Sequence, residues 1–269
     1  MKRTTLGLIL AGIALLAGGT AAPALAEPVC AAPSELTRAG FGLPRLAKSL
    51  EDKTPTTILV LNSSTQSEKK PAKTAGDKAA GDKTGAAKDA VPRRFPSYIE
   101  EILRARYPDG GIVVATQTQP RATAQAILTV LPDLLRVNKP SLLIWQTGTY
   151  DAILGVDTGA FGDAVGDGIR LAHEAKTDVI VVGPQYSPRT SFAFDVAPYT
   201  NTLRWSARSN GVPFFDRYDI MRYWQDEGIF DLDADRPSST LFDDVHGCIG
   251  RLLVGMIADG VDKKTLGSR

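Results

Sequence analysis

The sequence predicts an α/β fold, namely a single doubly wound, flavodoxin-like parallel sheet of five strands with helices on both faces in a three-layer αβα arrangement. Two observations predict it. Short aliphatic runs recur along the chain, and between them the apolar residues repeat with the period of a helix. Continuous apolar runs are typical of strands that are covered on both faces. Strands that alternate with helices indicate a parallel sheet with right-handed crossovers.

Five runs are the expected strands because each is short and almost entirely aliphatic. They are residues 58–61, 112–115, 142–145 and 179–182, with 212–215 as a weaker fifth. Ligands of doubly wound sheets bind beyond the carboxyl ends of the strands. The residues that directly follow each run are therefore where functional side chains are expected.

Three stretches carry apolar residues on one helical face. The first contains Ile127, Leu128, Leu131, Leu134 and Leu135; the second contains Phe161, Ala164, Val165, Gly168 and Ala172; the third contains Ile249, Leu252, Leu253, Met256 and Ile257. The third stripe is the strongest and predicts an amphipathic helix at the end of the chain.

The first residues have the pattern of a secretory signal peptide. Lys2 and Arg3 precede an uncharged apolar run over residues 6–17, and small residues at 24–26 form a cleavage site. The run is shorter than the roughly 20 residues that cross a bilayer as a helix. We expect cleavage after Ala26, a periplasmic or secreted protein without stable membrane insertion, and one domain over residues 27–269.

Residues 67–92 do not fit the alternating pattern. Lys, Ala, Gly, Asp and Thr dominate this segment, and large apolar residues are almost absent. Such a composition cannot bury enough surface to offset the entropy of ordering. The segment is predicted to be a disordered insertion, either a plain surface loop or a lid or polyanion-binding arm at the rim of a site.

Charge and composition exclude several classes of function. The formal net charge is +1, and the only lysine cluster lies in the 67–92 segment, which argues against nucleic acid as a partner. Two histidines and two cysteines without ligand spacing argue against a metal, and no cofactor is expected. In an oxidising compartment Cys30 and Cys248 form a disulfide or remain two thiols, and we favour the disulfide. The sequence does not indicate an oligomeric state.

Two motifs carry residues suited to nucleophilic catalysis. Asn62, Ser63 and Ser64 follow the first expected strand, while Asp243 and His246 precede the terminal amphipathic stripe. On the residues alone, Ser64 is equally a turn or helix-cap serine, and Asp243 a capping residue beside an ordinary surface histidine.

Together these motifs resemble the first and last blocks of the SGNH/GDSL hydrolase superfamily, Gly-Asp-Ser after a strand and Asp-x-x-His before the last helix. The resemblance implies that Ser64 is the nucleophile, His246 the general base and Asp243 the residue that orients the imidazole. Asp244 lacks the three-residue offset of that pattern. The resemblance extends from Ile58 to the end of the chain: residues 94–99 are similar to the start of the family's first helix, 116–135 to its second block, and 146–151 to its third block, Gly-x-Asn-Asp.

The second and third blocks depart from the family pattern. In the family an oxyanion is held by the nucleophile's N–H, a glycine N–H of the second block and the asparagine of the third. Here Gln119 or Pro120 aligns with the glycine, and Tyr150 with the asparagine; proline has no N–H to donate. Losing one such donor typically costs about 10²–10³ in rate. Candidate replacements or substrate contacts, each also readable as a structural loop residue, are Thr65, Gln119, Gln146, Thr149, Tyr150 and Gln185.

The sequence thus supports two functions. The first is an exported serine hydrolase or acyltransferase that acts on ester-linked acyl groups, such as small acyl esters or O-acetylated glycans. The second is a catalytically weak or inactive relative that binds a glycan or a protein partner. Ser64 and His246 favour the first function, and the altered second and third blocks favour the second.

Overall fold

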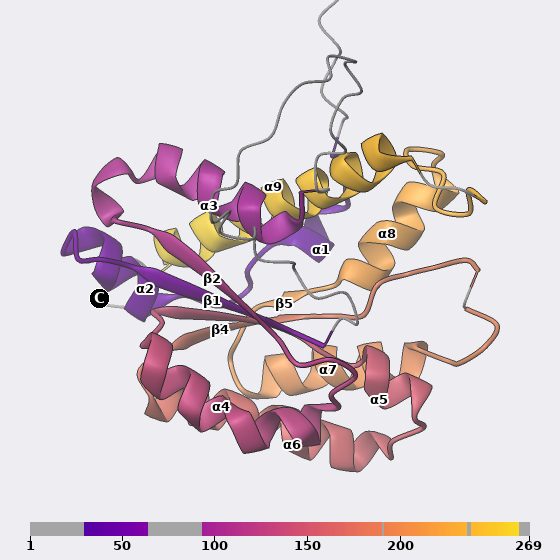
Figure 1. Cartoon of the computed structure of the whole chain (residues 1–269), viewed down its shortest axis with the longest axis horizontal. Coiled ribbons are helices and arrows are strands. Elements are labelled where there is room, and N and C mark those ends of the chain that lie inside the picture. Colours follow the sequence, from indigo (N-terminus) through magenta and orange to yellow (C-terminus); the bar gives the residue numbers. More distant parts are fainter. Residues whose placement is uncertain (1–29, 64–92, 190, 236–237, 264–269) are drawn as a thin grey trace, which may run out of the picture.

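The computed structural model describes residues 30–63, 93–189, 191–235 and 238–263. Its five strands form one parallel sheet in the order β2-β1-β3-β4-β5 (Figure 1), which confirms the predicted fold class. The strands are β1 (Thr57–Asn62), β2 (Val113–Thr118), β3 (Leu142–Gln146), β4 (Asp178–Val182) and β5 (Phe214–Phe215). The expected signal peptide at 1–26, the expected insertion at 67–92, Ser64 and Thr65 lie outside the described residues.

Strand order creates a switch point at the centre of the sheet. The chain passes from β1 to β2 on one side, and then to β3 on the other side of β1. Ligands of doubly wound folds bind where the order reverses in this way, beyond the carboxyl ends of the strands. Asn62, Ser63 and Gln146 lie at this position.

Helices cover both faces of the sheet, as Figure 1 shows. One layer contains α2 (Pro44–Glu51), α3 (Phe95–Arg106), α8 (Arg217–Asp226) and α9 (Ser239–Lys263); the other contains α4 (Ala124–Asn138), α6 (Thr158–Glu174) and α7 (Ala197–Ser209). Short elements complete the described chain: α1 (Ser34–Thr37), the 3-10 turn Pro108–Gly110 and α5 (Thr149–Ile153).

Side chains of each strand alternate between the two faces. In β3, Leu142 and Ile144 pack in the core beneath α3 and α9, whereas Leu143 and Trp145 pack in the core beneath α4 and α6. All four are fully buried. The aliphatic run therefore supplies two separate cores at once, which is why it lacks the alternation of a half-exposed strand.

Glycines allow two close approaches in these layers. A Cβ atom on Gly168 of α6 would lie 2.3 Å from the ring of Trp145, so this helix packs directly on the indole. A Cβ atom on Gly250 of α9 would lie 2.7 Å from Cβ of Tyr98 and 3.2 Å from the carbonyl oxygen of Phe95. The second contact places the first turn of α3 against α9, near His246.

The last helix begins earlier than its apolar stripe predicts. Ser238 Oγ accepts a hydrogen bond from the N–H of Leu241 (3.0 Å), which caps the helix. Asp243 and His246 consequently lie within α9 and not in a turn before it. The first turns carry mainly partly exposed residues, so the apolar pattern that reveals the helix starts only further along.

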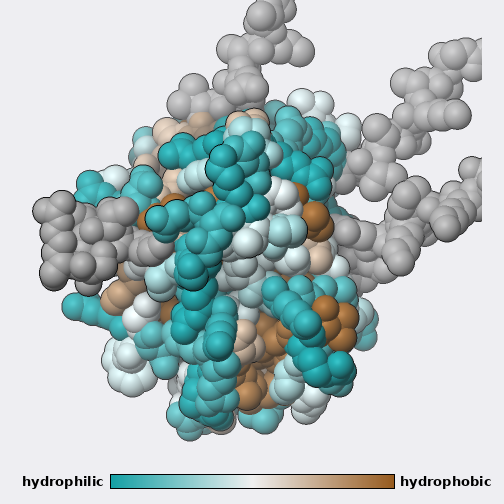
Figure 2. Space-filling view, turned by 90° about the vertical axis from the view of Figure 1, so that its left-hand side faces the viewer, coloured by the Kyte–Doolittle hydropathy of each residue, from teal (hydrophilic) through white to brown (hydrophobic). Residues whose placement is uncertain are grey.

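Figure 2 views the molecule from the end at which the strands begin, and that surface is predominantly hydrophilic with small hydrophobic patches. Within the described residues, no helix has both the length and the hydropathy needed to cross a membrane.

Candidate active site

Backbone hydrogen bonds join the chain at the end of β1 to the loop after β2. Ser63 is buried, and Ser64, the predicted nucleophile, follows it outside the described residues. The carbonyl of Asn62 accepts a hydrogen bond from the N–H of Gln119 (2.8 Å), and that of Ser63 accepts one from Arg121 (3.1 Å). These contacts fix the chain up to the residue before Ser64.

His246 lies on α9, partly buried between two aromatic rings. Its ring is 4.2 Å from that of Phe242 and stacks on Phe95 at 6.1 Å between centroids. Nδ1 accepts a hydrogen bond from the N–H of Phe95 (3.3 Å). Burial, followed by the positive charges of Arg217 and Arg94, lowers the pKa of His246 to about 3. The imidazole is therefore neutral at physiological pH.

Asp243 lies one helical turn before His246, but the two side chains bind different backbone groups. Oδ1 of Asp243 accepts a hydrogen bond from the N–H of Arg93 (2.9 Å), whereas His246 accepts one from Phe95. Among the described residues, no hydrogen bond joins Asp243 to His246. The start of α3 thus contacts both side chains of the motif.

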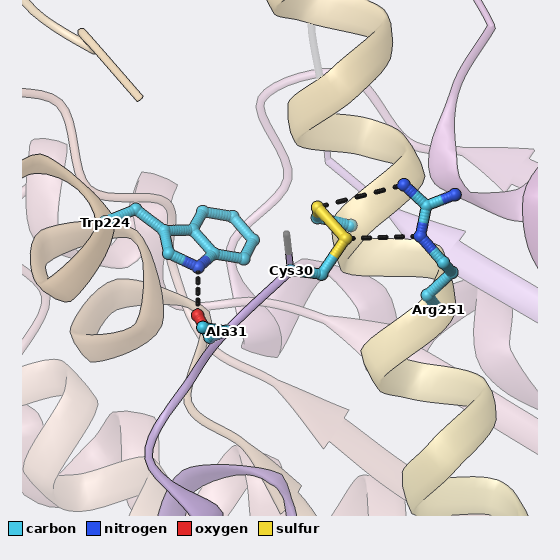
Figure 3. The surroundings of a disulfide bond; sticks show 5 residues. Cys30, Ala31, Trp224 and Arg251 are labelled. Atoms are coloured by element: carbon cyan, nitrogen blue, oxygen red, sulfur yellow. Dashed lines mark hydrogen bonds between the residues drawn. A yellow bond between two sulfur atoms is a disulfide. The ribbon is translucent and has the colours of Figure 1, made fainter. Parts of the chain in front are cut away.

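A disulfide anchors this part of α9. Cys248, two residues after His246, is bonded to Cys30 with the Cα atoms 5.1 Å apart, and the described residues contain no free cysteine (Figure 3). The predicted pairing is confirmed. Arg251 Nε contacts the sulfur of Cys30 at 3.2 Å, and Trp224 Nε1 donates a hydrogen bond to the carbonyl of Ala31 (2.7 Å). The first described residues of the chain are thereby held against α8 and α9.

The second block offers no free backbone donor at the predicted positions. The N–H of Gln119 is already bonded to the carbonyl of Asn62, and Pro120 has none. Arg121 adopts a positive φ of 59° and donates its N–H to Ser63. The chain therefore uses its amides here to fix the loop.

The third block contains a buried structural carboxylate. Oδ1 of Asp151 accepts a hydrogen bond from the N–H of Ala124 (2.9 Å) and so holds the start of α4. Burial raises the pKa of Asp151, and hydrogen bonds from backbone N–H groups oppose that rise. Thr149 and Tyr150 lie on α5 and are partly exposed. Tyr150 aligns with the family's asparagine, so a phenol stands at that position.

Arg217 is the site residue that the sequence reasoning missed. It is 4% exposed, and its Nη1 donates a hydrogen bond to Oε1 of Gln146 (3.1 Å) at the end of β3. By contrast, the predicted candidate Gln185 is exposed in the loop after β4, where Tyr186 packs edge-on against Tyr218. The rule that directs attention to the residues after each strand also applies to β5, but the weakness of that strand in the sequence hid Arg217.

A search among proteins of curated function gave no match to this chain. Solved structures share the fold. A catalytic mutant of Axe2, an acetylxylan esterase from Geobacillus stearothermophilus, is 14% identical, with a TM-score of 0.55 over 75% of this chain and 94% of that chain. A lipase/acylhydrolase from Enterococcus faecalis is 16% identical, with a TM-score of 0.52 over 74% and 96%. An alpha/beta hydrolase enzyme from the metagenome of Lake Arreo, Spain, is 13% identical, with a TM-score of 0.54 over 75% and 96%.

Residues 29–263 match a family described as the Non-GDSL lipase-like family. This match covers nearly the whole of the chain that follows the expected signal peptide. Together with the shared fold, it confirms the predicted relationship to the SGNH/GDSL hydrolases, while the family's description agrees with the altered first block. The chain is a member of the Non-GDSL lipase-like family.

Proposed function

We propose that this protein is an exported ester hydrolase or acyltransferase in which Ser64 is the nucleophile, His246 the general base and Asp243 its orienting carboxylate. The observation that carries the proposal is the neutral, half-buried imidazole of His246 on a disulfide-anchored helix. A histidine with so strongly shifted a pKa is more typical of a functional site than of a surface.

The chemistry follows that of a serine triad. Ser64 Oγ attacks the acyl carbon while Nε2 of His246 takes its proton, and the imidazolium then protonates the departing alcohol. Water attacks the resulting acyl-enzyme with the same ring as base and releases the acid. An acceptor alcohol in place of water gives transfer of the acyl group.

The proposal includes a rearrangement at the start of α3 and of the two residues before it. While Nδ1 accepts the N–H of Phe95, the neutral ring carries its proton on Nε2, which cannot then act as a base. The base form needs the proton on Nδ1 and an acceptor for it, and Asp243 lies one turn away. A shift of residues 93–95 away from the ring would let Asp243 accept from Nδ1.

Small acyl groups on glycans are the substrates that we favour. One protein of similar fold is an acetylxylan esterase. The expected signal peptide and the disulfide support action in the periplasm or outside the cell, where disulfides persist.

A second function, binding without turnover, is favoured by two specific observations. The second block has its amides occupied, and Nδ1 of His246 is bonded to a backbone N–H instead of a carboxylate. In that case the same edge of the sheet would hold a glycan or a protein partner of the cell envelope.

Turnover of an activated acyl ester by substituted proteins separates the two functions. Ser64→Ala and His246→Ala should each lower kcat by about 10²–10⁴, and the double variant should be little worse because the two residues act as a unit. Asp243→Asn should cost less, and Asp244→Asn serves as the matched control with nearly unchanged turnover. Equal turnover in wild type and both single variants, with the fold intact by circular dichroism, would leave only the binding function.

A further inference from the structure

The side chain of Arg217 crosses the carboxyl end of the sheet. Arg217 begins α8, two residues after the end of β5, and it reaches Gln146 at the end of β3. Because β4 lies between β3 and β5 in the sheet, the side chain reaches past β4 to the end of β3. This is the edge at which ligands of doubly wound folds bind.

Arg217 is a buried cation without an acidic partner among the described residues. The acidic residues nearest to it in sequence, Asp216 and Asp219, both bind Arg204. Burial lowers the pKa of Arg217 to about 10, which leaves the side chain charged at neutral pH. A buried charge is costly unless it is paired, so an arginine in this position needs a reason other than stability.

One edge of the guanidinium has no protein acceptor. Gln146 accepts from Nη1, while Nε is buried without a partner and no described residue accepts from Nη2. The N–H groups of Nε and Nη2 point in the same direction and form the fork that binds both oxygens of a carboxylate or phosphate. The side chain is thus arranged for an anion that the described part of the chain does not supply.

The charge also acts on the proposed catalytic base. Arg217 is the largest cause after burial of the low pKa of His246. An anion bound to the guanidinium would offset that positive charge and make the imidazole a better base. Binding of the correct substrate would then itself favour proton transfer.

We propose that Arg217 binds a carboxylate or phosphate group of the substrate, so that the enzyme prefers esters that carry an anionic group near the scissile bond. This inference rests on the proposed ester hydrolysis for its effect on turnover. Anion binding by Arg217 stands independently of it.

Two matched esters test the preference. Turnover of 4-nitrophenyl butyrate is compared with that of mono-4-nitrophenyl succinate, whose acyl chain has the same number of carbon atoms but ends in a carboxylate. Loss of a hydrogen bond to a charged group corresponds to about 10- to 100-fold, so Arg217→Gln should lower kcat/KM for the succinate ester by that factor and affect the butyrate ester much less. Arg222→Gln, which removes the same charge from a more exposed position on α8, should leave the preference unchanged.

Melting curves test the binding of an anion to Arg217 without requiring turnover of any ester. Succinate or inorganic phosphate should raise the Tm of the wild type above that in sodium chloride of equal ionic strength, and the better of the two identifies the anion. The rise should persist in Arg222→Gln and disappear in Arg217→Gln.

Three outcomes would overturn the inference: no rise of Tm with either anion, a rise that Arg217→Gln retains, or an equal loss on both esters. If Arg217→Gln fails to fold, the two measurements on the wild type serve as the test. A wild type that shows neither the rise in Tm nor the preference for the succinate ester overturns the inference. A Tm rise without turnover of any ester would refute the hydrolase and keep the anion site.

Discussion

The two sides of the candidate site are built differently. The side formed by α9 and α3 is held by the Cys30–Cys248 bond and by the glycine contact at Gly250, and it carries a neutral histidine. On the opposite side, the loop after β2 donates its backbone N–H groups of Gln119 and Arg121 to Asn62 and Ser63, and α5 after β3 carries a tyrosine at the position that aligns with the family's asparagine. Under the proposed function, the first side would transfer the proton, and the second would have to hold the oxyanion with groups other than those of the family.

The disulfide gives the largest expected effect on the histidine side. The bond joins residues 218 positions apart, and a closed loop of that length stabilises by about 5 kcal/mol in the chain-entropy treatment, as an upper bound. Cys30→Ser should therefore lower the urea midpoint markedly, and reducing agent should lower that of the wild type but not of the variant. Thiol counting on unreduced, denatured wild type should find none; two free thiols would refute the bridge.

The close contact between α3 and α9 can be disrupted by a single substitution at Gly250. Gly250→Ala places a methyl group against Tyr98 and the Phe95 carbonyl, and overpacking of this kind costs about 1–3 kcal/mol. The added methyl group should push α3 away from α9 and so move the N–H of Phe95 relative to His246. Turnover should therefore change as well. Gly255→Ala, on the same helix with open space around it, is the matched control and should change neither. Unchanged stability in Gly250→Ala would contradict the packing described here.

Most of the fold could be predicted from the sequence, and the reason is visible in β3. Leu142 to Trp145 are buried on both faces of the sheet, so their continuous apolar run predicts both that they form a strand and that helices cover the strand on both sides. The start of α9 could not be predicted, because a serine cap and outward-facing residues precede the stripe. Arg217 was missed because the strand before it, β5, is short and weak in the sequence, and because its burial and its contact with Gln146 are visible only in the packed structure.

Tyr150→Asn restores the asparagine with which the family holds an oxyanion. If a weak oxyanion hole limits the rate, Tyr150→Asn should raise kcat by about tenfold, a part of the roughly 10²–10³ that a single well-placed donor contributes. Tyr186→Asn, on the loop after β4, controls for the loss of a phenol near the site. A fall in kcat for Tyr150→Asn, with the fold retained, would show that the phenol itself serves the site.

A further expected effect is the pH dependence of stability due to His246. Its pKa in the folded protein lies below the usual value, so its contribution is complete above pH 6.5 and is lost as the pH falls toward 3. Urea midpoints at pH 7 and pH 4.5 should therefore differ more for the wild type than for His246→Gln. An identical difference in both proteins would mean that the imidazole is not shielded from protons as described.

Labelling with a serine-reactive fluorophosphonate tests whether Ser64 is a nucleophile activated by His246, and it requires no knowledge of the substrate. We expect wild-type protein to be labelled at Ser64, His246→Ala to be labelled much more slowly, and Ser64→Ala not to be labelled. Labelling of Ser64→Ala to the same extent as wild type, or no labelling of folded wild type at high probe concentration, would contradict the assignment of Ser64 and His246 as a catalytic pair.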